Sequence, residues 1–215
     1  MVRVATEVSS PVWQERIRFF ADADMDRVLQ LSKPDNVVLT DGHDLDSYAL
    51  SIECLKQICI SGLALEDEST ELLTFAGRIC RPIGILRFTS WRQNLRLSFQ
   101  RTVTEKNMRK FIINGSTGYQ LDLERLCEAL LQNSAISLSQ KPQLMLYYRQ
   151  EITTLSRHAD AEIIHGKDLI HSLAWYFDKT SEHIESLVFL GIWGNLENIR
   201  QLSNLKAAEE WVRAV

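Results

Sequence analysis

The chain has 215 residues, of which 45% are hydrophobic and 24% charged, and its formal net charge is −4 at pH 7. This length suits one sizeable domain, and this composition excludes a disordered or fibrous protein. The charge balance also excludes a global basic field, so contact with nucleic acid would need a local patch, a metal or a partner to offset the repulsion.

The cysteines show no metal-binding or disulfide pattern, because there is no CxxC pair and no His/Cys cluster. Most of them lie among aliphatic residues, where a free thiol behaves as a small hydrophobe. We therefore expect reduced, buried thiols, which suits a cytoplasmic protein. The N-terminus lacks the apolar core of a signal peptide, and no run approaches the roughly 18 apolar residues that span a bilayer. These features predict a soluble, cytoplasmic protein with no membrane partner.

The first part of the chain has the pattern of an α/β unit. Residues 2–8 alternate weakly, and residues 17–21 (IRFFA) and 36–40 (NVVLT) are β-branched and aromatic runs with turn residues nearby. The latter two segments are strand candidates. After them the apolar spacing changes to three and four, which predicts a helix with Asp44 as its N-cap and Gly62 as its stop.

Beyond Glu66 the pattern is mainly helical. An apolar stripe from Leu72 to Leu86 predicts a long helix, which Pro82 should kink or split. Residues 95–101 (LRLSFQR) alternate and predict a strand or edge ribbon, and residues 111–120 are rich in turn formers. Further helices are predicted at 122–134, 143–158 and 166–178, and in a C-terminal tail interrupted at Gly191 and Gly194.

These elements predict an α/β fold with a small Rossmann-like parallel sheet and a larger, mainly helical portion packed on it. We place the division at residue 62, so that residues 1–62 carry the sheet and residues 63–215 the helices. The chain has no GxGxxG or Walker lysine loop, which disfavours a nucleotide-dependent small-molecule enzyme on this sheet.

Acidic residues follow both central strands. Asp22 and Asp24 come directly after the first, and Asp41 ends the second, with Asp46 shortly after it. Ligands of parallel sheets bind beyond the carboxyl ends of the strands, where side chains converge. Closely spaced carboxylates raise each other's pKa unless a cation lies between them. The pattern favours Mg²⁺ or Mn²⁺ at these four residues, and such ions support phosphoryl transfer.

A structural interpretation stays open at each acidic position, since Asp commonly ends strands and caps helices. In this interpretation Asp44 is a cap, His43 is a surface turn residue, and Asp26 is a solvated helix start.

A second polar group lies in the segment IIHGKDLIHSL. His165 and Lys167 are placed to neutralise a phosphate or orient water, and Asp168 to cap the following helix. His165 and His171 are six residues apart, so they do not share a helix face as the histidines of an HxxxH zinc pair do. The alternative is a turn, a capped helix and a lone histidine.

Taken in order, these motifs resemble a Toprim-like family that includes the AriB-type nuclease subunit of PARIS anti-phage systems. The resemblance rests on FFADADMDRV, NVVLTDGHDLDSYAL and IIHGKDLIHSL, with AGRICRPIGILRF and LRLSF between them, and runs from about Ile17 to about Phe177. It implies a Toprim-like sheet and cleavage of DNA or tRNA in prokaryotic defence. It also implies control by an ABC-type (SMC-like) ATPase partner; a homodimer is left open.

Carried over by position, Asp22 and Asp24 match the DxD of the Toprim pattern, and the resemblance implies metal binding there. The resemblance also implies catalytic roles for these two residues and for Asp41, His165 and Lys167. Lys167 stands where the family usually has His, and the last acid of the second motif is Asp46 instead of the usual Glu.

The Toprim pattern also has a Glu-Gly turn well upstream of the DxD, and this chain lacks it. Glu7 is the acid that best matches the expected place of that Glu, and no Gly follows it. The alternative function is therefore a catalytically inactive interaction subunit that docks on the ATPase. Its docking surface would use C-terminal aromatic residues, namely Trp175, Phe177, Phe189, Trp193 and Trp211.

Overall fold

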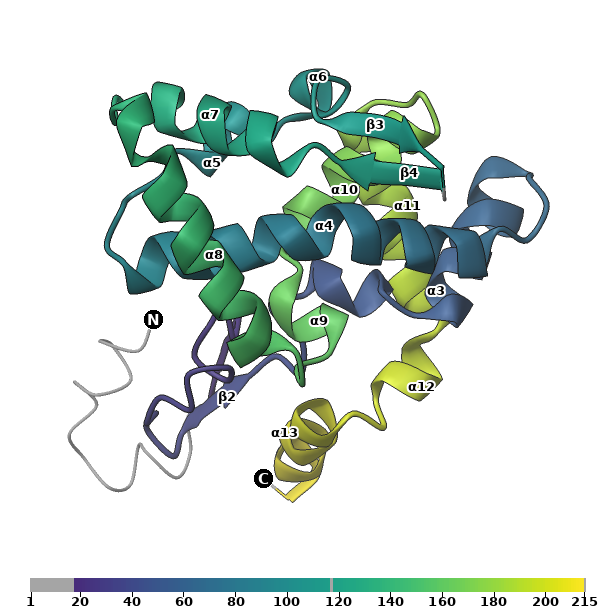
Figure 1. The fold of residues 1–215 in the computed structure, drawn as a ribbon. Helices are drawn as coiled ribbons and strands as arrows, with labels where there is room; N and C mark the ends of the chain where they lie inside the picture. The colour runs from purple at the N-terminus through teal and green to yellow at the C-terminus, as the bar shows by residue number, and fades with distance from the viewer. Residues whose placement is uncertain (1–17, 117, 215) are drawn as a thin grey trace.

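The computed structural model of the protein describes residues 18–116 and 118–214. The fold is mixed α/β and dominated by helices, with two small two-stranded sheets (Figure 1). The weakly alternating residues 2–8, which include Glu7, lie outside the described residues. No helix in the described ranges has both the length and the apolar character that a membrane crossing requires.

The strands predicted at residues 17–21 and 36–40 are confirmed and form a short parallel sheet. β1 (Phe19–Ala21) pairs with β2 (Val37–Leu39) residue for residue. The amide of Thr40 continues the pairing by donating to the carbonyl of Ala21. The carboxyl ends of both strands therefore meet at one edge of this sheet, as the sequence predicts.

A long helix, α4 (Ser69–Arg92), crosses the middle of the molecule and contributes buried residues to the core along most of its length (Figure 1). The predicted apolar stripe is buried along it. The prediction that Pro82 splits the helix is wrong, because the helix is continuous through this residue. α8 (Lys141–Leu155) and α10 (Gly166–Tyr176) both pack against α4. This packing outweighs the roughly 3 kcal/mol that an interior proline costs a helix.

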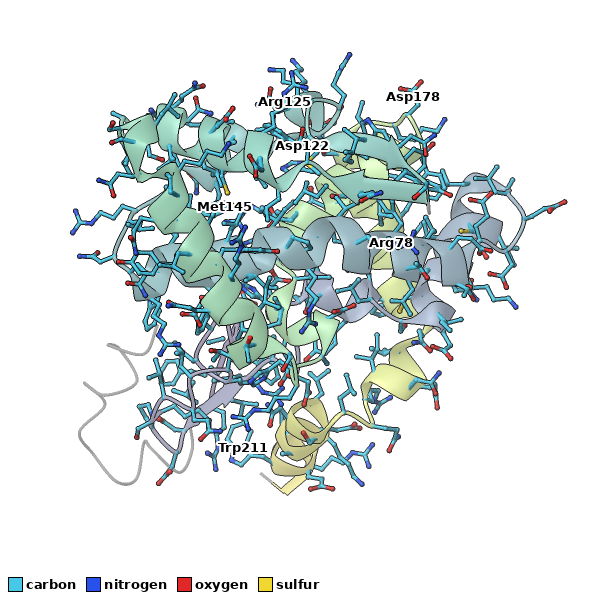
Figure 2. All side chains as sticks on the ribbon, in the orientation of Figure 1. Arg78, Asp122, Arg125, Met145, Asp178 and Trp211 are labelled. Carbon is cyan, nitrogen blue, oxygen red and sulfur yellow. The ribbon has the colours of Figure 1, made fainter. Side chains whose placement is uncertain are left out.

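Tyr48, Cys54 and Ile199 form a small cluster separate from the apolar core around α4, to which most of the remaining elements contribute. In chain order the remaining elements are a 3₁₀ turn (Asp46–Ala49), α3 (Ile52–Gln57), a π-helical turn (Ile58–Gly62), α5 (Phe99–Thr102), α6 (Glu105–Met108), β3 (Ile112–Gly115), β4 (Gly118–Leu121), α7 (Leu123–Asn133), a 3₁₀ turn (Leu138–Gln140), α9 (Asp160–Ile163), α11 (Ser181–Gly194), α12 (Leu196–Ile199) and α13 (Ser203–Ala214). The side chain of Asp122 accepts a hydrogen bond at the start of α7, where Figure 2 labels it.

Three segments differ from the prediction. The alternating residues 95–101 form no strand, because Ser90 Oγ and Ser134 Oγ accept hydrogen bonds from the amides of Leu97 and Ser98 that a strand would use. The turn-rich residues 111–120 form the antiparallel β3–β4 hairpin. α11 runs through Gly191, where a Cβ would lie 2.9 Å from the carbonyl oxygen of Cys54.

All four cysteines are free and buried, as predicted. The division at residue 62 stays a prediction; α3, on its N-terminal side, packs against α4 and α11 of the larger portion.

Candidate functional site

A cavity of about 620 Å³ opens where the parallel strands end. Its wall combines the turn after β1, the loop after β2, α4 and the start of α10. The residues that line it are Asp22, Asp24, Asp44, Leu45, Asp46, Arg87, Gln100, Val103, His165, Lys167, Asp168 and His171. The structure thus brings together most of the acidic and basic residues that the three sequence motifs supply.

Hydrogen bonds join the two acidic loops. The amide of Asp24 donates to the carbonyl of His43 over 2.7 Å, and the amide of Ala23 donates to Thr40 Oγ1 over 2.9 Å. Asp24 has a φ of 44°, in the left-handed region that Asp tolerates better than most residues. Asp22 and Asp24 therefore occupy a fixed turn at the cavity.

Asp44 links the second motif to the third. Its buried carboxylate accepts hydrogen bonds from the amide of Ser47, over 2.9 Å, and from the amide of Gly166, over 2.8 Å. The first bond joins the loop to the 3₁₀ turn that follows it, whereas α3 begins at Ile52 and is capped by Ser51, so the prediction of Asp44 as the helix N-cap is wrong. Burial opposes ionisation, but the neighbouring His43, the Gly166 amide and His165 outweigh it and leave the pKa of Asp44 lowered.

Gly166 permits this close approach of the two loops. A Cβ at this position would lie 2.2 Å from the Cβ of Asp46 and 2.6 Å from Asp44 Oδ1. A side chain here would push the third motif away from the second.

Three carboxylates of the cavity, those of Asp22, Asp24 and Asp46, accept no hydrogen bond from the rest of the described chain. Burial raises the pKa of Asp24, and Asp22 and Asp44 raise it further, while the nearby His43 lowers it. Burial likewise raises the pKa of Asp46, with a contribution from Asp44. This repulsion is what a bound cation would relieve.

The imidazoles of His165 and His171 line the cavity, and both have a lowered pKa that favours their neutral form. Burial, followed by Arg87, lowers the pKa of His165. Its Nδ1 accepts a hydrogen bond from the amide of Lys167 over 3.1 Å, which places the ring proton on Nε2. Burial also lowers the pKa of His171, whose Nδ1 lies 2.8 Å from Ser181 Oγ.

His43 is not the surface turn residue that the structural interpretation suggests, because it is only 3% exposed. Its amide donates to the carbonyl of Ala161 over 2.7 Å, which draws the loop inward against α9. His43 Nδ1 is buried and has no hydrogen-bond partner within the described ranges.

Asp168 does not cap α10, because the side chain of His165 fills that role. The buried Asp168 carboxylate instead accepts two hydrogen bonds from Arg87, both of 2.7 Å. The Arg87 guanidinium also stacks 4.5 Å above the ring of Phe99. Arg87 was not predicted as a site residue, since its partner lies 81 residues away and no local pattern marks the pair.

Asp41 does not join Asp22 and Asp24, contrary to the prediction that groups all three. Its Oδ1 accepts hydrogen bonds of 3.0 Å from Ser203 Oγ and from the amide of Asn204. Free amides at the start of α13 therefore hold this carboxylate on the other side of the loop. Asp46, in contrast, does line the cavity with Asp22 and Asp24.

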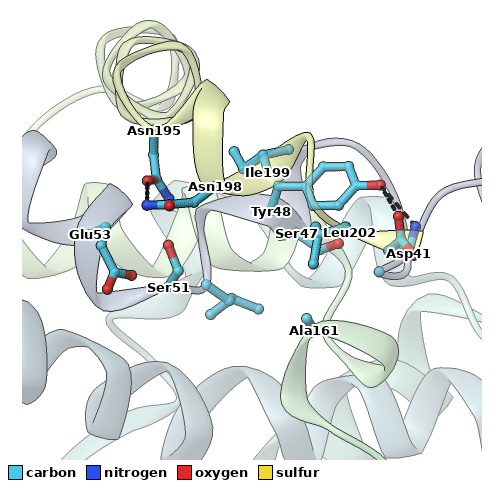
Figure 3. Close-up of a pocket in the computed structure, with 12 residues that line it drawn as sticks. Asp41, Ser47, Tyr48, Ser51, Glu53, Ala161, Asn195, Asn198, Ile199 and Leu202 are labelled. Carbon is cyan, nitrogen blue, oxygen red and sulfur yellow. Dashed lines mark hydrogen bonds between the residues drawn. The ribbon is translucent and has the colours of Figure 1, made fainter. Parts of the chain in front are cut away.

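Asp41 lines a second cavity, which Figure 3 shows. This cavity has a volume of about 260 Å³ and lies between the 3₁₀ turn and the C-terminal segment. The Tyr48 hydroxyl points at Asp41 and accepts a hydrogen bond of 2.8 Å from its amide. Beyond it, α13 places Trp211 next to the N-terminal strand region (Figure 2), where the guanidinium of Arg18 lies 5.8 Å above its ring.

No three His, Cys, Asp or Glu side chains in the described ranges are arranged as a ready-made metal cage. Mg²⁺ does not require one, because it keeps several waters and commonly binds one or two carboxylates together with substrate phosphates. The carboxylates of Asp22, Asp24 and Asp46 are oxygen donors of the kind that hard divalent ions prefer. The donor chemistry of the cavity therefore fits such an ion.

Comparison with known proteins finds no matching family model, no matching curated protein and no matching solved structure. The candidate site is therefore defined by its geometry and charge.

Proposed function

We propose that this protein is a divalent-cation-dependent phosphodiesterase that cleaves nucleic acid. One observation carries the proposal: three carboxylates without a hydrogen-bond donor in the described chain share a cavity with Lys167 and His165. Five carboxylates and two permanent cations line this cavity. Such a surface repels a phosphodiester unless a cation screens it.

Asp22, Asp24 and Asp46 would hold the cation. When bound, the ion would neutralise and polarise a phosphate. Lys167 is exposed at the cavity and would attract the phosphate backbone. His165, with its proton on Nε2, would donate a hydrogen bond to a phosphate oxygen.

Arg87 would act indirectly in this scheme. Its hydrogen bonds to Asp168 fix the start of α10, and so they position His165 and Lys167 without engaging the substrate.

We further propose that the protein has a Toprim-like architecture and acts in prokaryotic anti-phage defence. An ABC-type ATPase would control it. Adjacent parallel strands that lead into acidic turns support this architecture, since this is where the Toprim pattern carries its DxD. Glu7, which best matches the expected place of the upstream glutamate, lies outside the described residues.

Cleavage assays test the proposed function. Purified protein would be incubated with Mg²⁺ or Mn²⁺ and with DNA or tRNA, alone and with the triggered ATPase. Asp22→Asn and Asp24→Asn should each lower the cleavage rate by about 100-fold, the scale of losing a charge-stabilising group. Asp26→Asn is the matched control, because Asp26 lies in the same acidic turn but does not line the cavity. If the wild type and an Asp22/Asp24 double variant leave every nucleic-acid substrate equally intact, the proposed function is refuted.

An interaction subunit without catalysis is the second candidate, and one surface favours it. α11 exposes Phe189, Leu190 and Trp193, which are 61%, 57% and 65% exposed. Exposed apolar groups of this size often mark a protein-binding surface. Trp175, by contrast, stacks on Phe75 in the core and is not part of this surface. Calorimetric titration discriminates the candidates: tight ATPase binding with no cation binding favours the interaction subunit.

A further inference from the structure

The imidazole of His43 is an unexplained buried polar group at the edge of the acidic cavity. Its side chain is 4% exposed, and Nδ1 has no hydrogen-bond partner within the described chain. A buried polar atom without a partner is destabilising, so its presence calls for a physical reason. Nδ1 lies 3.4 Å from Asp44 Oδ2 and 3.9 Å from Asp24 Oδ1.

These separations match those of donors that share one ion. Donors at about 2.2 Å from a metal are about 3.1 Å apart when adjacent and about 4.4 Å apart when opposite. Both distances from His43 Nδ1 fall within this interval. Each is also too long for a good hydrogen bond from an imidazole to a carboxylate.

The surroundings fix two of the three donors and leave the third able to adjust. The Ala161 carbonyl holds the His43 amide, and the amides of Ser47 and Gly166 hold the Asp44 carboxylate. The Asp24 side chain is 71% exposed, while its amide is tied to the His43 carbonyl. A rotation of the Asp24 side chain would therefore complete a three-donor group.

We propose that His43 and Asp44 join Asp24 as ligands of the cation that the proposed function places among Asp22, Asp24 and Asp46, and that the site, through the His43 nitrogen, prefers Mn²⁺ or Fe²⁺ to Mg²⁺ and Ca²⁺. Imidazole nitrogen suits transition metals, whereas Mg²⁺ and Ca²⁺ take oxygen ligands. His165 does not compete as a ligand through Nδ1, because that atom already accepts the hydrogen bond of the Lys167 amide. This inference rests on the proposed function only in placing a cation in the same cavity.

Pulsed electron paramagnetic resonance of bound Mn²⁺ tests this assignment, since it detects coupling to a directly bound ¹⁴N nucleus. Wild-type protein should show imidazole nitrogen coupling. His43→Asn should abolish the coupling and weaken Mn²⁺ binding by about 10- to 100-fold, with Mg²⁺ binding much less affected. His165→Asn and His171→Asn are matched controls from the same cavity and should retain the coupling. The wild-type spectrum is decisive even if His43→Asn does not fold.

The outcomes separate this inference from the proposed function. Bound Mn²⁺ without nitrogen coupling, with binding lost in Asp24→Asn, overturns the role of His43 and leaves the phosphodiesterase standing. Coupling that survives in folded His43→Asn also overturns it. Nitrogen coupling in a protein that cleaves no nucleic acid supports the ligand and refutes the function. No Mn²⁺ binding in wild type overturns the role of His43, and the cleavage assay with Mg²⁺ then decides the proposed function.

Discussion

At the scale of single residues, the site is defined by which carboxylates have hydrogen-bond donors and which do not. Asp44 has two amide donors and ionises readily, whereas Asp46, two residues later, has none in the described chain. Asp168 is fully buried but is paired with Arg87. The same side chain thus joins two loops at Asp44, pairs with an arginine at Asp168 and has no hydrogen-bond donor at Asp46 within the described chain.

Asp46→Asn tests the repulsion within the cavity. Burial and Asp44 raise the pKa of Asp46 above its ordinary value of 3.8. A carboxyl whose pKa is higher in the folded state destabilises the fold as pH rises through the unfolded and then the folded pKa. The penalty is absent below both values and complete above both. Asp46→Asn should therefore raise Tm at pH 7 and leave it unchanged near about pH 3. Calorimetry across this range measures the effect, and a lower Tm at pH 7 would contradict it.

Asp168→Asn tests the ion pair beneath the cavity. Removing the charge leaves the Arg87 guanidinium without its buried partner, so the free energy of unfolding should fall by about 3 kcal/mol. Glu128→Gln is the control, because the Lys141–Glu128 pair is solvent-exposed at Glu128 and contributes little. Urea denaturation measures both variants. A loss in Asp168→Asn no larger than in the control would contradict this account.

At the scale of elements, loops from distant parts of the chain meet through backbone contacts. The start of α10 reaches the loop after β2 because Gly166 has no side chain. α13 reaches the same loop from the other side, through the hydrogen bonds that Asp41 accepts. The loop after β2 is therefore held between two helix N-termini.

Gly166→Ala should disturb this junction. The new Cβ would meet Asp46 and Asp44, and crowding of this kind lowers the free energy of unfolding by about 1–3 kcal/mol. Gly194→Ala is the matched control, because a Cβ there comes no closer than 3.5 Å to a neighbouring atom. Chemical denaturation compares the two. Equal stabilities of both variants would show that the loops do not pack as closely as described.

Asp41→Ala should release the start of α13 without affecting the cavity. Loss of a helix cap costs about 1 kcal/mol, so amide hydrogen exchange in residues 204–214 should accelerate about fivefold. Mn²⁺ affinity should stay unchanged, because Asp41 points away from Asp22 and Asp24. A marked loss of Mn²⁺ affinity with unchanged exchange in α13 would restore Asp41 as a ligand.

Local patterns predicted the two strands of the parallel sheet, most helices and the turn that carries Asp22 and Asp24. They did not predict that the Asp41 carboxylate accepts a hydrogen bond from Ser203, which lies 162 residues away. The pairing of Arg87 with Asp168 and the burial of His43 against Ala161 are likewise long-range. The hairpin at residues 111–120 was missed because its strands are short and its turn residues dominate the segment.

At the scale of the whole molecule, a helical body supports a small parallel sheet and an acidic cavity beside it. Asp44 and Asp168 line the cavity with little exposure, and the buried His43 lies next to Asp44, while Asp22, Asp24 and Lys167 are accessible to solvent. This arrangement suits a rigid cation site with an open entrance for a large substrate such as nucleic acid.

Anomalous X-ray diffraction from crystals containing Mn²⁺ shows directly whether this cavity holds a divalent cation. We expect an anomalous peak in the cavity, within about 2.5 Å of an Asp24 carboxylate oxygen. Crystals with Mn²⁺ that show no peak there, or a peak only beside Asp41, would contradict it.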